Sequence, residues 1–174
     1  MPSLVHSSYS SSHSDPSSSK MAPPATPAEE NSTGETDILF KNELIDRVTF
    51  EQILEMDDDE EEREFSKGIV YGFFEQAEAT FDNIEQAINS KNLEEVSQLG
   101  HFLKGSSATL GLNKVKESCE KIQHFGAQKD ESGTRFEPDQ AKCLAKASRV
   151  LTDVKQEYKE VSNLLKRFYG APME

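Results

Sequence analysis

One histidine near the middle of the chain has neighbours suited to phosphoryl-transfer chemistry. It begins the stretch H-F-L-K-G-S-S-A-T-L-G-L, which runs from His101 to Leu112. A neutral imidazole is nucleophilic near pH 7 and can attack an electrophilic phosphorus. The ammonium of Lys104 can offset negative charge on phosphoryl oxygens, and Gly105 has no Cβ to block a partner. We therefore take His101 as a candidate nucleophile, with Lys104 and Gly105 as its supporting residues.

Helical geometry places this histidine on the surface. At about 100° per residue, the apolar residues around it fall in one sector, and His101 lies about 145° from the middle of that sector. The sector contains Leu93, Val96, Leu99, Gly100, Leu103 and Leu110. A mid-helix glycine costs about 1 kcal/mol relative to alanine, so we expect Gly100 to face a neighbouring helix and Gly105 a partner. On these residues alone, an ordinary surface histidine remains the alternative.

The composition limits the classes of partner. The chain has 174 residues, with 32 acidic and 19 basic side chains and a net charge of −13. Nucleic-acid binding depends on Lys and Arg contacts to phosphates, so this charge argues against it and favours basic protein surfaces. The two cysteines, Cys119 and Cys143, lie in apolar helical patterns and are expected to be core thiols. The sequence has no secretory signal and no 18-residue apolar run, so we expect no transmembrane helix and no membrane contact. We also expect a cytoplasmic and nuclear location.

The spacing of apolar residues predicts an all-α fold. Residues 1–40 are rich in Ser and Pro and are expected to form a disordered tail, followed by one domain at 41–170. Apolar residues three and four apart predict a short helix at 49–57 and four long ones. The long helices are expected at 65–89, 92–110, 114–127 and from Pro138 to about Tyr169. Expected boundary residues are Thr49, Ser66, Asn92, Gly111 and Asn113.

Four amphipathic helices joined by mostly short loops can bury their apolar stripes in an up-and-down four-helix bundle. We expect the short helix to cover one end, and the domain to be a monomer. Val70, Tyr71 and Phe74 widen the apolar surface beyond one stripe. These three residues form either extra core contacts or a patch that faces a partner.

An acidic segment, M-D-D-D-E-E-E-R-E, precedes the first long helix. A calcium loop of the EF-hand type needs glycine at position six and glutamate at position twelve. Counted from Asp57, these positions hold Glu62 and Gly68, so the pattern fails. The segment is a solvated charged loop or a contact for a basic partner.

The stretch from His101 closely resembles the phosphorylation motif of histidine-containing phosphotransfer (HPt) proteins, most of all the fungal phosphorelay intermediates. Two further blocks carry the resemblance: I-L-E-M-D-D-D from Ile53, with F-S-K-G from Phe65, and C-E-K-I-Q from Cys119. It covers about residues 48–130. It implies an HPt four-helix bundle in which His101 becomes phosphohistidine. The phosphoryl group would come from a receiver-domain aspartate of a hybrid histidine kinase and pass to an aspartate of a response regulator.

The resemblance also implies roles for other residues. Lys104 and Gly105 match the motif, and Gln123 matches a glutamine that hydrogen-bonds and orients the imidazole. Relatives have a basic residue at the position of Ala127, and the sequence leaves open whether Lys129 takes its place. No cofactor is implied for this chain, since Mg²⁺ would belong to the receiver domain. Contacts with the receiver are implied for Met56, Asp57, Glu60, Phe65, Ile69 and Ser106.

Two other functions compete with phosphotransfer. A non-catalytic helical adaptor would bind a partner through the acidic loop and the patch of Val70, Tyr71 and Phe74. A histidine kinase is disfavoured because the sequence has no P-loop and no glycine-rich ATP site.

Overall fold

The computed structural model describes residues 27–170, with side chains from residue 34 onward. Every regular element in this range is a helix, and one isolated bridge joins Lys129 and Phe136. The prediction of an all-α fold is therefore confirmed. The helices are α1 (Pro27–Phe40), α2 (Arg47–Leu54), α3 (Glu64–Asn89), α4 (Leu93–Leu110), α5 (Asn113–Gly126) and α6 (Gln140–Phe168).

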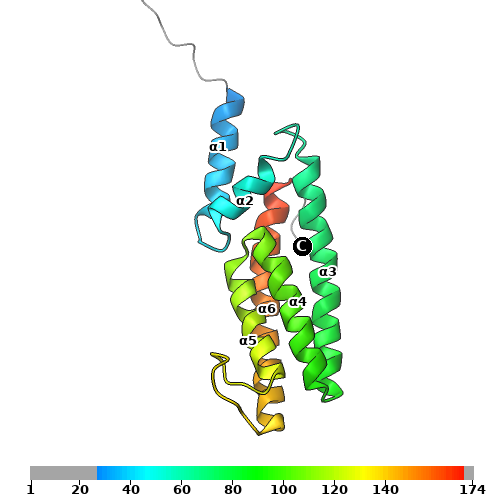
Figure 1. Cartoon of the computed structure of the whole chain (residues 1–174). Coiled ribbons are helices and arrows are strands. Elements are labelled where there is room, and N and C mark those ends of the chain that lie inside the picture. The colour runs from blue at the N-terminus through cyan, green and yellow to red at the C-terminus, as the bar shows by residue number, and fades with distance from the viewer. Residues whose placement is uncertain (1–26, 171–174) are drawn as a thin grey trace, which may run out of the picture. The chain divides into compact units, whose positions relative to one another are not determined.

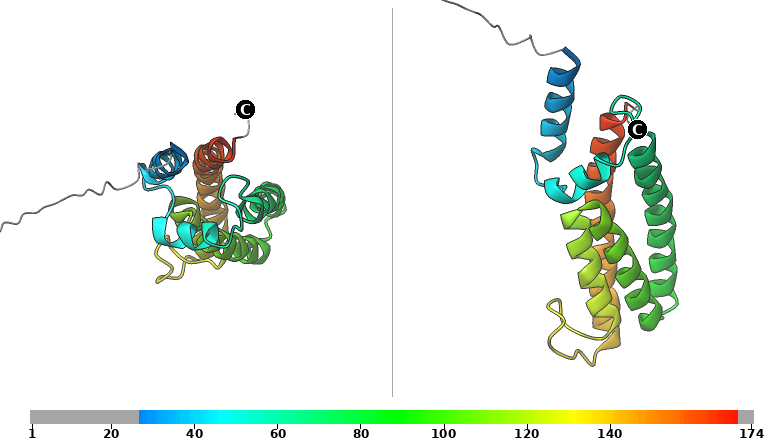
Figure 2. Two further views of the ribbon diagram at one scale, coloured as in Figure 1. Left: turned by 90° about the horizontal axis from the view of Figure 1, so that it is seen from above. Right: turned by 45° about the horizontal axis from the view of Figure 1, so that its top comes forward.

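Helices α3 to α6 form the predicted up-and-down bundle. Each packs against the next in the chain, and α6 closes the ring against α3. Figure 1 shows the four helices side by side along one long axis, and the end-on view in Figure 2 shows their ring arrangement. The short connections at residues 90–92 and 111–112 make α4 run antiparallel to both α3 and α5, and the longer loop at 127–139 leads into α6, which runs back along α5. The helix that contains His101, α4, therefore lies between α3 and α5.

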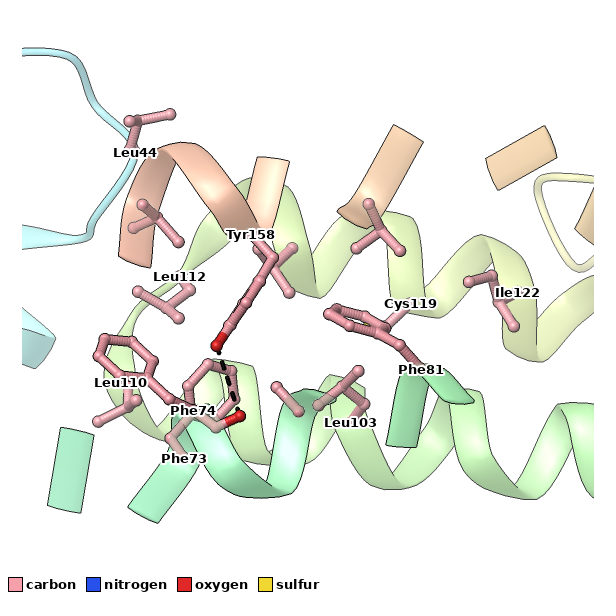
Figure 3. Packing of buried hydrophobic residues seen from close by; sticks show 14 of the residues in the cluster. Leu44, Phe73, Phe74, Phe81, Leu103, Leu110, Leu112, Cys119, Ile122 and Tyr158 are labelled. Carbon is pink, nitrogen blue, oxygen red and sulfur yellow. Dashed lines mark hydrogen bonds between the residues drawn. The ribbon is translucent and has the colours of Figure 1, made fainter. Parts of the chain in front are cut away.

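The core is rich in aromatic side chains. Tyr158 of α6 lies among the Phe rings of α3, with its ring centre 5.3 Å from that of Phe81. Its hydroxyl donates to the carbonyl oxygen of Phe74 at 3.4 Å, as Figure 3 shows. Burial raises the pKa of Tyr158, so this hydroxyl keeps its proton at physiological pH. Val70 and Phe74 are 0% and 4% exposed. Of the two alternatives left open by the sequence, core contacts are therefore confirmed for Val70 and Phe74, and Tyr71 is partly buried against the same core.

The helix boundaries correct several sequence predictions. Helix α2 begins after Asp46, whose carboxylate accepts from the Thr49 amide at 3.0 Å, so Thr49 is not the cap. Helix α6 begins after Asp139, two residues later than a start at Pro138 would give. Asn113 is the first residue of α5 and makes no capping bond. The carboxylates of Asp46 and Asp139 cap α2 and α6, and apolar spacing alone could not show which polar residue makes the capping bond.

Other boundary predictions are confirmed. The side chain of Asn92 accepts from the Glu95 amide at 3.2 Å and caps α4. Gly111 ends the same helix with φ +74°, in the left-handed region that favours glycine. One further boundary is corrected, since α3 starts at Glu64 after Arg63 and not at Ser66.

The tail was predicted to be disordered up to residue 40, but its last part is helical. Residues 1–26 lie outside the described part of the chain, but Pro27–Phe40 is helical. Leu39, near the end of this helix, is 1% exposed and belongs to the core of residues 34–170. The stretch 1–40 has few apolar residues, but Leu39 and the partly buried Phe40 at its end pack against the core.

Helix α2 is fixed to the turn that follows the His101 helix. The amide of Asp46 donates to the carbonyl oxygen of Gly111 at 2.7 Å. A Cβ on Gly111 would lie 3.1 Å from the Cβ atoms of both Asp46 and Thr49. The absence of a side chain at Gly111 thus allows α2 to sit against the α4–α5 turn. No helix in residues 27–170 is long and apolar enough to cross a membrane.

Candidate functional site

His101 lies in the middle of α4 with its side chain exposed, as its helical position predicted. The structure shows no hydrogen bond or ion pair between this imidazole and any residue from 34 to 170. An imidazole without an internal partner keeps a ring nitrogen lone pair available to an incoming electrophile. The backbone beneath it is fixed by a regular helix that packs on both sides. His101 is thus an accessible nucleophile on a rigid support.

Lys104 lies one turn after His101 on the same helix and reaches toward α5. Its Nζ is 3.5 Å from Oε1 of Glu120. The Lys104 side chain is 29% exposed and that of Glu120 is 40% exposed, so the ion pair is in contact with water. Sequence reasoning selected Lys104 but did not identify Glu120. The signal was present in the C-E-K-I-Q block, where Glu120 precedes Gln123 by three residues, about one helical turn.

The two glycines beside His101 have opposite surroundings, as predicted. A Cβ on Gly100 would lie 2.8 Å from the amide nitrogen of Gln123 and 3.0 Å from the carbonyl oxygen of Cys119. A Cβ on Gly105 would meet nothing within 4 Å. Gly100 thus permits close packing of α4 on α5, whereas Gly105 leaves open space beside His101 that a partner can enter.

Gln123 is held beside the His101 helix through its backbone. The hydroxyl of Ser97 donates to the carbonyl oxygen of Gln123 at 3.0 Å, and Gly126 contacts the Ser97 backbone one turn later. The Oε1 atom of Gln123 is buried and has no hydrogen-bond partner among the residues that the structure describes. The implied hydrogen bond to His101 is not formed in this structure, in which the imidazole is exposed. Gln123 therefore has a free acceptor close to α4.

The four predicted catalytic residues, His101, Lys104, Gly105 and Gln123, all lie within the part of the chain that matches a known family. The model of the Hpt domain matches residues 69–164, which is more than half of the chain. The chain belongs to the Hpt domain family.

The sequence relatives are fungal proteins with related names. "Multistep phosphorelay regulator 1" of Schizosaccharomyces pombe is 44% identical over 135 residues, covering 78% of this chain and 45% of the relative. "Phosphorelay intermediate protein YPD1" of Candida albicans is 49% identical over 83 residues, covering 48% of this chain and 44% of the relative. The chain thus spans about half the length of the relatives that it matches.

Solved structures support the same fold. A crystal structure of yeast Ypd1p has a TM-score of 0.63 and 27% identity, covering 74% of this chain and 95% of that one. The Medicago truncatula protein MtHPt2 has a TM-score of 0.65 and 23% identity, covering 83% of this chain and 89% of that one, and supports the fold alone. The bundle of α3 to α6 is therefore an Hpt bundle in topology as well as in family.

The predicted docking residues of this Hpt domain differ in their surroundings. Met56 and Phe65 are exposed large apolar side chains, at 60% and 49%. Glu60 is exposed in the acidic loop. Ile69 is half-buried against the core, and the Ser106 hydroxyl donates to the carbonyl oxygen of Phe102 at 3.2 Å. Met56, Phe65 and Glu60 thus offer more free surface than the other two.

Asp57 has a structural role that the sequence did not indicate. One of its carboxylate oxygens accepts from the Ser66 amide at 2.8 Å, and the other accepts from the Ser66 hydroxyl at 2.6 Å. The Tyr169 hydroxyl donates to the same Ser66 oxygen at 2.8 Å. These bonds join the acidic loop, the first turn of α3 and the end of α6. We call the three residues Asp57, Ser66 and Tyr169 the loop anchor.

Phe102 was missed by sequence reasoning. It follows His101 directly, and 46% of its surface is exposed. An apolar side chain on the outer face of a packed helix is a signal for a docking contact. At about 100° per residue, Phe102 lies about 120° from the middle of the apolar sector, so the geometry that placed His101 outside could have identified it. Within residues 34–170, no cluster of three or more His, Cys, Asp or Glu side chains is arranged to hold a metal ion.

Proposed function

We propose that this Hpt domain carries a phosphoryl group on His101 between receiver domains of a multistep phosphorelay. The observation that carries the proposal is an exposed, unbonded imidazole with Lys104 one turn away and open space at Gly105, in a chain of this family. A rigid surface nucleophile suits a reaction in which the electrophile arrives on another protein. Phosphorelay names among the relatives support the same function.

The transfer step needs no cofactor from this chain. A lone pair on one ring nitrogen of His101 attacks the phosphorus of a receiver acyl phosphate. The N–P bond forms as the P–O bond to the aspartate breaks, and the carboxylate leaves with that electron pair. The other ring nitrogen keeps its proton, so the product is a cationic phosphoimidazole that can release the group to a second carboxylate by the reverse step. Mg²⁺ bound by the receiver would assist both steps, and Lys104 would balance phosphoryl charge from this side.

The proposed partners are receiver domains of a hybrid histidine kinase and of response regulators. A solved structure described as a complex of Saccharomyces cerevisiae Ypd1 with the receiver domain of its downstream response regulator Ssk1 has a TM-score of 0.63 and 30% identity to this chain. The exposed side chains Met56, Phe65, Glu60 and Phe102 are the contacts that we assign to such a domain. A monomeric state and a cytoplasmic and nuclear location remain predictions.

A labelling experiment tests the proposal. The purified chain is incubated with a panel of receiver domains that carry ³²P on aspartate, and the acid-labile, base-stable label of phosphohistidine is measured. The wild type should gain label, His101→Gln should gain none, and His124→Gln should be labelled as the wild type is. Label that persists in His101→Gln, or a wild type that no receiver labels, would overturn the proposal. ATP alone should give no label.

The non-catalytic adaptor is the second candidate, and the structure removes its main support. Two of the three side chains assigned to its docking patch, Val70 and Phe74, are buried in the core. An adaptor would bind receiver domains with unchanged affinity in wild type and His101→Gln, and neither protein would accept label.

A further inference from the structure

We propose that Glu120 is a positioning residue that competes with the phosphoryl group for Lys104. This inference rests on the proposed function of His101. In the unphosphorylated structure, Nζ of Lys104 lies 3.5 Å from Oε1 of Glu120 on the neighbouring helix. The residue suited to stabilise phosphohistidine is thus already paired with a carboxylate when His101 is free.

The surroundings of Glu120 restrict it to this cation. His124, one turn later on α5, has its Nε2 3.9 Å from the same Glu120 oxygen. However, Nδ1 of His124 is 2.8 Å from the carbonyl oxygen of Glu131, which can only accept, so Nδ1 carries the proton. In neutral His124 the Nε2 atom then presents a lone pair to Glu120 and not a donor. Nearby Lys121 has a carboxylate of its own, with Nζ 3.0 Å from Oε1 of Glu131.

Competition for Lys104 would keep the phosphoryl group easy to transfer. A phosphoryl group brings close to two negative charges, which would draw Lys104 away from Glu120 or share it. The carboxylate of Glu120 weakens the stabilisation of phosphohistidine in two ways, because it holds the cation and adds a like charge nearby. A relay protein must accept and release the group with similar ease. Glu120 therefore lowers the stability of the phosphorylated state toward that of an acyl phosphate.

Removing the carboxylate should shift the transfer equilibrium toward phosphohistidine. For Glu120→Gln we expect a shift of about two- to fivefold in the equilibrium constant with a phosphorylated receiver domain, the range that solvent-exposed ion pairs give. Hydrolysis of the isolated phosphohistidine should slow by a similar factor. Glu117→Gln, with the same charge change one turn earlier on α5, is the matched control and should shift the constant less. Glu120→Asp keeps a carboxylate and should lie closer to the wild type.

A double-mutant cycle decides whether Glu120 acts through Lys104. In a Lys104→Gln background, Glu120→Gln should have no larger effect than Glu117→Gln. The proposal is overturned if Glu120→Gln matches Glu117→Gln in the wild-type background, or if its full effect persists without Lys104. Unfolding of each variant in urea detects a loss of folding, which Glu120→Asp would then rescue. Labelling of the wild type distinguishes the two possible failures. A wild type that takes no label refutes phosphotransfer by His101, whereas a labelled wild type with an unaltered Glu120→Gln variant refutes only the role of Glu120.

Discussion

The backbone of Gln123 lies against Gly100, with the Gln123 amide nitrogen 2.8 Å from where a Gly100 Cβ would stand. The contact is between backbones, so no side-chain rotation can relieve an added methyl group. Through it, the helix with His101 and the helix with Gln123 keep one fixed spacing.

Gly100→Ala should therefore destabilise the domain despite the better helix propensity of alanine. Overpacking costs about 1–3 kcal/mol and the propensity gain returns about 1 kcal/mol, which leaves a net loss of up to about 2 kcal/mol. Unfolding in urea measures it. Gly105→Ala is the matched control, and because a Cβ there meets nothing within 4 Å, this variant should be at least as stable as the wild type. Equal stability of the two variants would contradict the packing argument.

Phe102→Ala should weaken receiver binding without changing the stability of the domain. The ring is 46% exposed beside His101, so its loss removes little core contact but much of an apolar surface available to a partner. We expect at least a fivefold rise in Kd for the receiver domain, measured by calorimetry with His101→Gln as the non-reacting parent. Phe136→Ala, on the loop between α5 and α6, removes a ring that is 70% exposed and should leave Kd unchanged. An equal effect of both variants would indicate non-specific apolar binding.

Tyr169→Phe should loosen the loop anchor. Its hydroxyl donates to Ser66, and burial raises the pKa of Tyr169 to about 12, so it remains a donor at physiological pH. Loss of this bond should cost about 1 kcal/mol and speed hydrogen exchange at the Ser66 amide, which donates to Asp57. Tyr71→Phe is the control, since the Tyr71 hydroxyl is buried without a hydrogen-bond partner in residues 34–170, and its removal should be neutral or stabilising. Unchanged exchange in Tyr169→Phe would rule out the anchor.

Glu157→Gln should stabilise the domain at neutral pH but not at acidic pH. Burial raises the pKa of Glu157 above its ordinary value of 4.5, and the hydrogen bond from Ser118 offsets this in part. A raised carboxyl pKa means that the folded state binds the proton more tightly, so wild-type stability falls as pH rises through 4.5. Glutamine avoids this loss and can still accept from Ser118. The gain in Tm should be clear at pH 7 and shrink near pH 4, and a gain independent of pH would refute the charge argument.

The sequence predicted the bundle well because apolar spacing records which helix face is buried. It placed His101 outside, and Gly100 and Gly105 on opposite sides, for the same reason. The sequence-based predictions failed where a single contact with a residue distant in the sequence determines where a helix begins or whether a segment is ordered. Leu39 ties a polar stretch to the core, and the position of Asp46 at the start of α2 depends on the Gly111 turn. Apolar spacing does not identify a polar partner on another helix, such as Glu120 for Lys104, and the only signal for it was its place one turn before Gln123.

The free space beside Gly105 is one opening on one helix face, next to one histidine. Two receiver domains that both reach His101 through this opening would have overlapping binding surfaces. The donor and the acceptor would then bind one after the other, and dissociation of the donor would limit the rate at which the acceptor binds. Donor and acceptor receivers would therefore compete for one binding surface, and an excess of the donor would slow transfer to the acceptor.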